Sequence, residues 1–322
     1  MTTRTILLFA EAGPTTEIYW ELLPAGWVIE SLDDRNDEAE KRDRLSRADV
    51  VISADVVLST AHLDAAGRLK LIQRQGVGFD SVDLDSAEER GIAVCLCPVG
   101  TPEAVAEHAL LLMLAVGRFL VTLHAQVSDG GWPKWDYRGR SMGLSGTQVG
   151  IVGFGRIGQA VVTRLLAFGA HPIVVQRPGR TLDTDWVERG VEQATDLDDA
   201  FRRSDIISLH CPLTEETSCM VDRRRLELMP GHGILINTAR GAIVVEDDLV
   251  EHLRTGRIAG AGLDVMVDEP PPADHPLRTL PNALITPHMA PGTRTTQITR
   301  AKVVIDNAVA VMNGDEPRFR IR

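Results

Sequence analysis

The chain has 322 residues, a formal net charge of -11 and a hydrophobic fraction of 44%. This length and composition predict a globular protein of about two domains with a sizeable core. The acidic balance argues against a general nucleic-acid-binding surface, which needs clustered Lys and Arg. No apolar run approaches the roughly 18 residues of a membrane span. The N-terminal apolar run ends at Glu11 and is no signal peptide, so we expect no membrane association.

The first hundred residues alternate short apolar runs with helical patterns. We expect strands at 6–9, 27–29, 49–52, 69–72 and 92–94, and a solvated helix within 33–47. Strands that alternate with helices indicate βαβ units and a parallel sheet. The first hundred residues therefore predict a small open α/β domain.

Two glycines flank Val77 just after the strand expected at 69–72. Loops at the carboxyl ends of parallel strands are where such sheets bind ligands. Successive backbone N–H groups in this loop can form an anion-binding nest. A plain turn is the alternative for this stretch.

The segment 103–127 has apolar residues at helical spacing and is apolar nearly all round. Such a helix is buried, in a core or against another subunit. We favour a subunit interface, and hence a homodimer. His108 on this helix is interpreted as a structural histidine.

A strand, a glycine-rich turn, a helix and a second strand follow between residues 149 and 175. Gly153, Gly155 and Gly158 have the G-x-G-x-x-G spacing of dinucleotide-binding proteins. The first glycine permits a tight turn, the second lets backbone approach a pyrophosphate, and the third lets helix pack on strand. The helix N-terminus offers N–H groups to the phosphates. A lone motif of this kind can be a plain turn, but its context here favours a cofactor site.

The residue expected to hold the ribose lies about 20 positions after the glycines. A carboxylate there binds the ribose 2′-hydroxyl and repels a 2′-phosphate. This chain has Gln176 followed by Arg177, so we favour NADP over NAD. The alternative is that Gln176 still binds NAD and the arginine faces solvent.

Further strands are expected at 205–210, 234–237 and 283–286, with helices at 246–254 and 293–313. Arg240, Asp264, Glu269 and His288 fall at or just beyond the ends of apolar runs, where ligands bind in such sheets. Carbonyl reduction by hydride transfer needs a group that holds and polarises the substrate, which Arg can do. It also needs a proton donor active near neutral pH, such as a His paired with a carboxylate.

The four cysteines are Cys95, Cys97, Cys211 and Cys219. They do not form the regular framework of a disulfide-rich domain, so we expect reduced thiols and a cytoplasmic location. The Cys95-x-Cys97 pair is interpreted as small residues at a strand end. No His or second Cys pair lies at ligand spacing, so we expect no metal.

In combination, several motifs resemble those of the D-isomer-specific 2-hydroxyacid dehydrogenase family over nearly the full length. The matching stretches are 76–80, 104–108, the glycine-rich turn, 237–241, 262–265, 268–270 and 286–288. The family implies two doubly wound α/β domains, with a Rossmann cofactor domain (101–290) inserted into a flavodoxin-like substrate domain (1–100 completed by 291–322). It also implies dimers that exchange contacts through the long helix.

The resemblance implies roles for individual residues. Arg240, Glu269 and His288 would be catalytic, and Asp264 would contact the nicotinamide amide. The backbone amides of Val77 and Gly78 would bind the substrate carboxylate. Further cofactor contacts would come from Arg156, Ile157, Cys211, Pro212, Thr217 and Thr238.

Departures from the family pattern include Gln176 at the ribose position, and Leu96, Val99 and Thr101 in the domain connector. The sequence predicts an oxidoreductase that reduces a small 2-oxo acid, of glyoxylate or hydroxypyruvate type, to a D-2-hydroxy acid with NAD(P)H. The alternatives are a non-catalytic cofactor-sensing corepressor or scaffold, and a phosphite-type dehydrogenase. The sequence does not identify the substrate's side chain.

Overall fold

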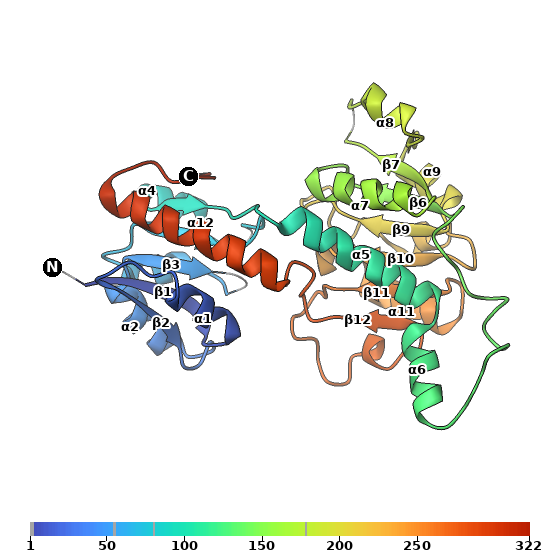
Figure 1. Cartoon of the computed structure of the whole chain (residues 1–322), viewed down its shortest axis with the longest axis horizontal. Coiled ribbons are helices and arrows are strands. Elements are labelled where there is room, and N and C mark those ends of the chain that lie inside the picture. Colours follow the sequence, from blue (N-terminus) through green and yellow to red (C-terminus); the bar gives the residue numbers. More distant parts are fainter. Residues whose placement is uncertain (1–2, 54–55, 80, 178) are drawn as a thin grey trace. The chain divides into compact units, whose positions relative to one another are not determined.

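A computed structural model describes residues 3–53, 56–79, 81–177 and 179–322 (Figure 1). Asp80, the last residue of the 76–80 motif, lies outside these ranges. The chain folds as two compact units, Met1–Thr101 with Gly292–Arg322 (unit 1) and Pro102–Pro291 (unit 2). Each unit is built on one parallel sheet. The predicted fold class, two α/β domains with parallel sheets, is confirmed.

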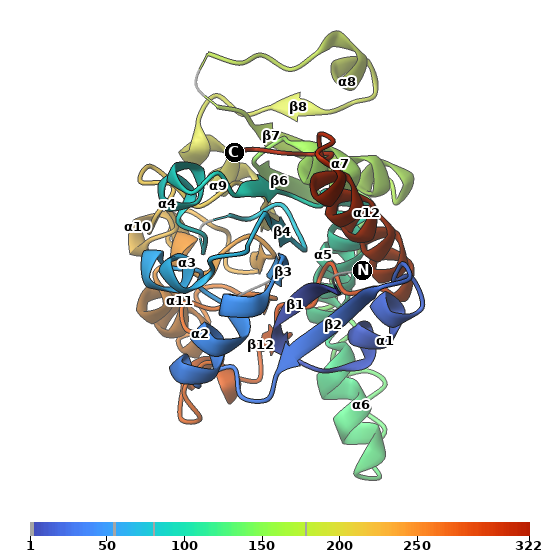
Figure 2. The ribbon, with the colours of Figure 1, turned by 90° about the vertical axis from the view of Figure 1, so that its left-hand side faces the viewer.

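The sheet of unit 1 has the strand order β2-β1-β3-β4-β5, the flavodoxin-like doubly wound order. Its strands are β1 (Arg4–Glu11), β2 (Trp27–Leu32), β3 (Val50–Ser53), β4 (Leu71–Arg74) and β5 (Ala93–Cys95). One face packs against α1 (Pro14–Trp20) and α12 (Arg294–Asn313). The other packs against α2 (Glu38–Arg47), α3 (Thr60–Ala65) and α4 (Leu84–Glu89), as Figure 2 shows.

The sheet of unit 2 has the order β12-β11-β10-β9-β6-β7-β8. Its strands are β6 (Gln148–Val152), β7 (His171–Val175), β8 (Glu192–Gln193), β9 (Ile206–Leu209), β10 (Ile234–Asn237), β11 (Gly260–Leu263) and β12 (Ala283–Ile285). The direction of strand addition reverses between β6 and β9, the switch point at which Rossmann folds bind dinucleotides.

Helices cover both faces of this second sheet. One face packs against α5 (Thr101–Gly117) and α7 (Arg156–Ala167). The other packs against α9 (Leu197–Arg203), α10 (Arg223–Leu226) and α11 (Glu246–Arg254). The short helix α8 (Thr184–Glu188) lies between β7 and β8, and single 3-10 turns occur at η1 (Gly241–Ile243) and η2 (Pro276–Arg278).

The long helix expected at 103–127 is two helices, and that prediction was wrong. α5 ends at Gly117 and α6 (Leu120–Ser128) follows at an angle of 57°. Phe119 has the left-handed backbone conformation, with φ of 54°. The carbonyl of Gly117 accepts a hydrogen bond from Met142 N at 2.8 Å instead of continuing the helix. The helical spacing of apolar residues continues through the break, so the sequence pattern did not indicate that the helix ends there.

The two helices have different surroundings. α5 is buried along most of its length, whereas α6 has no buried residue and projects from the body of unit 2 (Figure 1). Within the described ranges no single helix is long and apolar enough to cross a membrane. The bent α5–α6 pair meets that test by length and composition alone.

β11 was not predicted as a strand because its sequence is Gly-Ala-Gly-Leu. Glycine weakens a strand unless another element approaches closely. A Cβ atom at Gly260 would lie 2.6 Å from Cγ1 of Val116, and one at Gly262 would lie 2.9 Å from Cβ of Leu112. The glycines therefore let α5 lie directly on this strand.

Candidate active site

The glycine-rich turn follows β6 at the switch point of the unit 2 sheet. Gly153 has φ of 98°, and a Cβ atom there would lie 2.7 Å from backbone atoms of His210 and Cys211. At Gly158 a Cβ atom would lie 2.2 Å from the carbonyl oxygen of Gly153. Both glycines are therefore required by the protein's own packing.

Gly155 differs from its two neighbours in the motif. A Cβ atom there would meet no described atom within 4 Å, so the protein itself leaves this position open. Gly155 is also the N-cap of α7, and no described side chain caps that helix. An open backbone beside uncapped N–H groups fits the approach of a pyrophosphate. Arg156 and Ile157 begin the helix at this place.

The ends of the neighbouring strands supply the next predicted contacts. Thr238, just after β10, has a buried hydroxyl oxygen with no hydrogen-bond partner among the described residues. Buried polar atoms in native proteins are normally bonded, so this hydroxyl fits a ligand contact. The hydroxyl of Thr217 donates to Pro212 O at 2.7 Å, which holds the loop that begins at half-buried Cys211. These residues fit a dinucleotide cofactor.

Gln176 and Arg177 follow β7 next to the glycine turn, since β6 and β7 pair in register up to Val152 and Val175. Gln176 is half-buried and Arg177 is exposed. The amide of Gln176 donates to Thr181 O at 3.3 Å. Neither residue at this strand end carries a negative charge.

Asp264 follows β11 on the same carboxyl edge of the sheet, and 1% of its surface is exposed. Its Oδ1 accepts from the hydroxyl of Thr286 at 2.6 Å and from Met289 N at 3.0 Å. Its Oδ2 accepts from Ala290 N at 2.8 Å. Its backbone oxygen accepts from His288 N at 2.8 Å. Asp264 therefore holds the segment 286–290 that carries His288.

His108 of α5 completes this buried network. Its Nε2 lies 2.9 Å from the hydroxyl of Thr286 and 3.3 Å from Oδ1 of Asp264. Because the single hydroxyl proton of Thr286 goes to Asp264, Nε2 of His108 must donate to Thr286. Burial raises the pKa of Asp264, but the bonds from His108, Thr286 and two backbone amides outweigh it and hold the pKa below its usual value. The carboxylate is therefore charged near neutral pH.

His288 has a positive φ of 50° and a side chain that is 40% exposed. Its Nδ1 lies 2.7 Å from Oε2 of Glu269, while Oε1 of Glu269 accepts from Met266 N at 3.1 Å. The hydrogen bond that His288 donates to Glu269 raises the pKa of His288 above its usual value, against the opposing effects of burial and of Arg240. The bond to Nδ1 leaves Nε2 as the atom that can exchange a proton with a ligand.

Arg240 is brought to this pair by the packing of its neighbour Gly241. A Cβ atom at Gly241 would lie 2.0 Å from the carbonyl carbon of Met266, so the loop leading to Glu269 presses on the residue after Arg240. Asn237, 1% exposed, fixes the backbone by donating to Arg240 O at 2.8 Å and accepting from Ala239 N at 3.0 Å. Nη1 of Arg240 donates to Ala239 O at 2.7 Å.

The predicted substrate loop lies in unit 1, after β4. Val77 is 41% exposed, and the backbone N–H groups of Val77 and Gly78 have no acceptor among the described residues. Nε of Arg74 donates to Gly78 O at 2.9 Å, and Gly76 O accepts from Cys97 N at 2.9 Å. The loop is thus held by its carbonyl groups while its N–H groups remain available, as in an anion-binding nest.

Unit 2 brings Arg240, Asp264, Glu269 and His288 together at the carboxyl ends of β10, β11 and β12. Sequence reasoning missed Thr286 and Asn237 as positioning residues, and it treated His108 as structural. Asn237 ends the buried strand β10, and Thr286 follows the half-buried strand β12. A polar residue at the end of an apolar run is the signal that could have found both. Within the described ranges, no group of three or more His, Cys, Asp or Glu could hold a metal ion.

Comparisons with known proteins agree with this geometry. The model of the NAD binding domain of D-isomer specific 2-hydroxyacid dehydrogenases matches residues 110–290. The glyoxylate reductase of Thermofilum pendens is 40% identical over 257 residues, 79% of this chain and 75% of that protein. The hydroxypyruvate reductase of Thermotoga maritima is 36% identical over 276 residues, 83% of this chain and 87% of that protein. A solved structure from Thermus thermophilus has a TM-score of 0.88 at 38% identity and covers 99% of this chain and 100% of its own.

Proposed function

This chain belongs to the D-isomer specific 2-hydroxyacid dehydrogenase family, and on that premise we propose that it reduces a small 2-oxo acid, of glyoxylate or hydroxypyruvate type, to the D-2-hydroxy acid. The observation that carries the proposal is the His288–Glu269 pair at 2.7 Å, held beside Arg240 at the ends of β10 to β12. The names of the relatives from Thermofilum pendens and Thermotoga maritima support this substrate class.

The side chains divide the work of the reaction between them. Arg240 offers paired N–H donors that hold the substrate carboxylate and polarise its carbonyl. His288 gives a proton from Nε2 to the oxygen that becomes the hydroxyl. Glu269 keeps His288 protonated and oriented. The backbone N–H groups of Val77 and Gly78 hold the substrate carboxylate.

The cofactor is a nicotinamide dinucleotide, which supplies the hydride when it is bound. We propose that Gly155, Arg156 and Ile157 receive its pyrophosphate, and that Asp264 fixes its carboxamide. Cys211, Pro212, Thr217 and Thr238 would line the rest of its site.

NADP is the favoured form of the cofactor in this proposal. Gln176 stands where a carboxylate would repel a 2′-phosphate, and exposed Arg177 follows it. The neutral amide of Gln176 does not repel the 2′-phosphate of NADP, and the guanidinium of Arg177 can bind it.

Initial rates with glyoxylate, hydroxypyruvate, pyruvate and a bulky 2-oxo acid, each with NADPH and NADH, test the proposal. We expect a measurable rate, faster with NADPH. Chiral chromatography should show the D configuration for the products of hydroxypyruvate and pyruvate, since the product of glyoxylate has no stereocentre. A rate that prefers NADH would keep the reaction and contradict the cofactor preference. Cofactor binding without turnover of any oxo acid would support a non-catalytic sensor instead.

We also propose that the chain forms a homodimer through α6 and the loop after it. The apolar side chains Leu120, Val121, Val127, Trp132 and Trp135 are between 44% and 78% exposed. Monomeric proteins rarely leave so many large apolar groups together in solvent. The sequence predicted a dimer interface along the whole segment 103–127. We now propose only α6 and the loop after it, because most of α5 is buried within unit 2.

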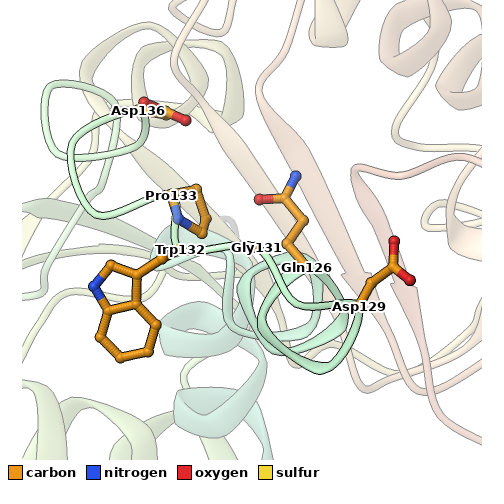
Figure 3. Close-up of a pocket in the computed structure, with 6 residues that line it drawn as sticks. All are labelled: Gln126, Asp129, Gly131, Trp132, Pro133 and Asp136. Atoms are coloured by element: carbon orange, nitrogen blue, oxygen red, sulfur yellow. The ribbon is translucent and has the colours of Figure 1, made fainter.

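The surface formed by α6 and the loop after it also has a hollow. An open hollow is lined by Gln126, Asp129, Gly131, Trp132, Pro133 and Asp136 (Figure 3). Trp132 points away from Gln126 and Asp129 in that view.

Sedimentation of wild type and of Val121→Asp tests the dimer. We expect a wild-type mass of twice 35.1 kDa and a monomer for the variant, and a monomeric wild type would contradict the proposal.

A further inference from the structure

Arg300 lies on α12 in unit 1, in surroundings that are unusual for a charged side chain. It is 3% exposed and belongs to the helix face that packs against β-strands and Tyr19. Its Nη2 donates to the hydroxyl of Thr101 at 2.6 Å, and this is a neutral partner. Its Nε is buried without a partner among the described residues.

The charge of Arg300 is not balanced by any acidic residue in the described ranges. Guanidinium groups stay protonated in proteins, and burying a charge without a paired charge is costly. The groups near enough to feel its charge are Tyr19 and Cys97. Burial raises the pKa of both, so both are neutral near pH 7.

Further donors accompany this guanidinium. The Tyr19 hydroxyl accepts from Nε2 of Gln75 at 3.1 Å, and its own proton has no acceptor among the described residues. One turn before Arg300 on α12, Oε1 of Gln297 is buried without a partner. Rotating this amide by half a turn would present its N–H group instead. Gln75 and Gln297 are half-buried, so the cluster extends to the surface of unit 1.

We propose that Arg300 is the centre of an anion-binding site in unit 1, completed by Thr101 and Gln297, which takes a carboxylate or a small inorganic anion of similar size. A bound anion supplies the negative charge that Arg300 lacks among the described residues, and it accepts from Nε of Arg300. A carboxylate suits a guanidinium because two of its oxygens can accept at once.

The anion can come from two sources, free anions in solution or a second acidic group on the substrate. The cluster adjoins the substrate loop, since Gln75 precedes Gly76 and Cys97 N donates to Gly76 O at 2.9 Å. Binding of a substrate's second acidic group rests on the proposed function. Binding of a free anion does not depend on activity.

Thermal unfolding of the full chain tests the free-anion source. Chloride or acetate replaces a bulky organic sulfonate, which has no carboxylate, at constant ionic strength, so that general screening stays the same. The variants are Arg300→Met, which removes the charge, and Arg294→Met, which removes an exposed arginine from the same helix. If the site exists, changing the reference anion for chloride or acetate raises Tm by about 2–4 °C for wild type and for Arg294→Met. The same change should leave the Tm of Arg300→Met unaltered.

Arg300→Met should fold, because apolar replacement of a buried unpaired charge is often neutral or stabilising. Gln297→Met is the second variant, and it should weaken the Tm response without altering net charge. An equal response in wild type and Arg300→Met would contradict a free-anion site at Arg300.

Kinetics test the substrate source. The kcat/KM of oxaloacetate is compared with that of 2-oxobutyrate, which has the same chain length and no second carboxylate. If the second carboxylate binds Arg300, Arg300→Met lowers this ratio by about tenfold or more. No response in either experiment overturns the anion site, whereas failure of the proposed function appears as no turnover by wild type of either oxo acid or of glyoxylate.

Discussion

The candidate site uses two parts of the carboxyl edge of the unit 2 sheet, and these two parts are built differently. At the carboxyl ends of β6 and β7, the backbone shapes the site, through Gly153, Gly155 and Gly158. At the ends of β10 to β12, side chains shape it, through hydrogen bonds that tie His288, Glu269 and Asp264 to one another or to backbone groups.

This difference fits what the proposed function requires at each place. A pyrophosphate needs space and N–H groups, which glycines and a helix N-terminus supply. Proton transfer needs a side chain fixed in direction and protonation state, which requires partners around it. Changes at the first part should therefore alter cofactor binding, and changes at the second should alter turnover.

His288→Ala should have the largest effect. Loss of the proton donor should lower kcat by about 10²- to 10⁴-fold, while the Kd of the cofactor measured by fluorescence stays near that of wild type. His232→Ala, which removes an exposed histidine bound to Asp205, is the control. Near-normal turnover by His288→Ala would remove His288 from the mechanism.

Glu269→Gln should shift the pH profile of reduction. Reduction requires protonated His288, so the rate falls as pH rises through the pKa of that histidine. Glu269 raises this pKa, and the neutral amide should let it fall, so the decline should begin at lower pH. Asp268→Asn removes an exposed neighbouring charge and should leave the profile in place. Profiles of kcat against pH that coincide for wild type and Glu269→Gln would contradict the pairing.

Gly155→Ala and Gly158→Ala form a matched pair within the glycine turn. At Gly158 the methyl group would lie 2.2 Å from Gly153 O, so the free energy of unfolding should fall by about 1–3 kcal/mol. At Gly155 the methyl group meets no described atom, so stability should change by less than about 0.5 kcal/mol. The Kd of the cofactor should still rise about tenfold, because the methyl group occupies space left for the pyrophosphate. Urea unfolding and cofactor titration separate the two effects, and unchanged cofactor affinity of Gly155→Ala would be evidence against this site.

Gln176→Asp should have the smallest effect on the reaction itself and should change only the choice of cofactor. A carboxylate at this position repels the 2′-phosphate, so kcat/KM for NADPH relative to NADH should fall by about tenfold. Gln176→Asn has the same size as the aspartate without its charge and should keep most of the preference. Equal ratios for the two variants would show that charge at residue 176 does not select the cofactor.

Local patterns were sufficient to predict much of this structure. The glycine turn needs only residues within ten positions of one another, and the buried strands are visible as apolar runs. The last helix begins at Arg294 after its cap, Thr293, and ends at Gly314 with φ of 85°, close to the boundaries that the sequence indicates. The proposed roles of Arg240, Glu269 and His288 rest on the family motifs, because each residue alone is indistinguishable from a surface charge.

Contacts between distant parts of the chain could not be predicted. His108 meets Thr286 across 178 positions, and no pattern near either residue indicates that contact. The break at Phe119 is fixed by Met142, which lies outside the helical segment. Arg300 is buried although arginine on an amphipathic helix is normally exposed, so its setting became visible only in the folded unit.

Isotope transfer tests the central claim most directly. The wild-type chain is incubated with glyoxylate and with NADPH that carries deuterium at the transferable C4 position, and the product is analysed by mass spectrometry and NMR. We expect one deuterium at C2 of the hydroxy acid, formed about 10²- to 10⁴-fold more slowly by His288→Ala. Bound cofactor with no labelled hydroxy acid, from glyoxylate or from hydroxypyruvate, would contradict hydride transfer as the function of this site.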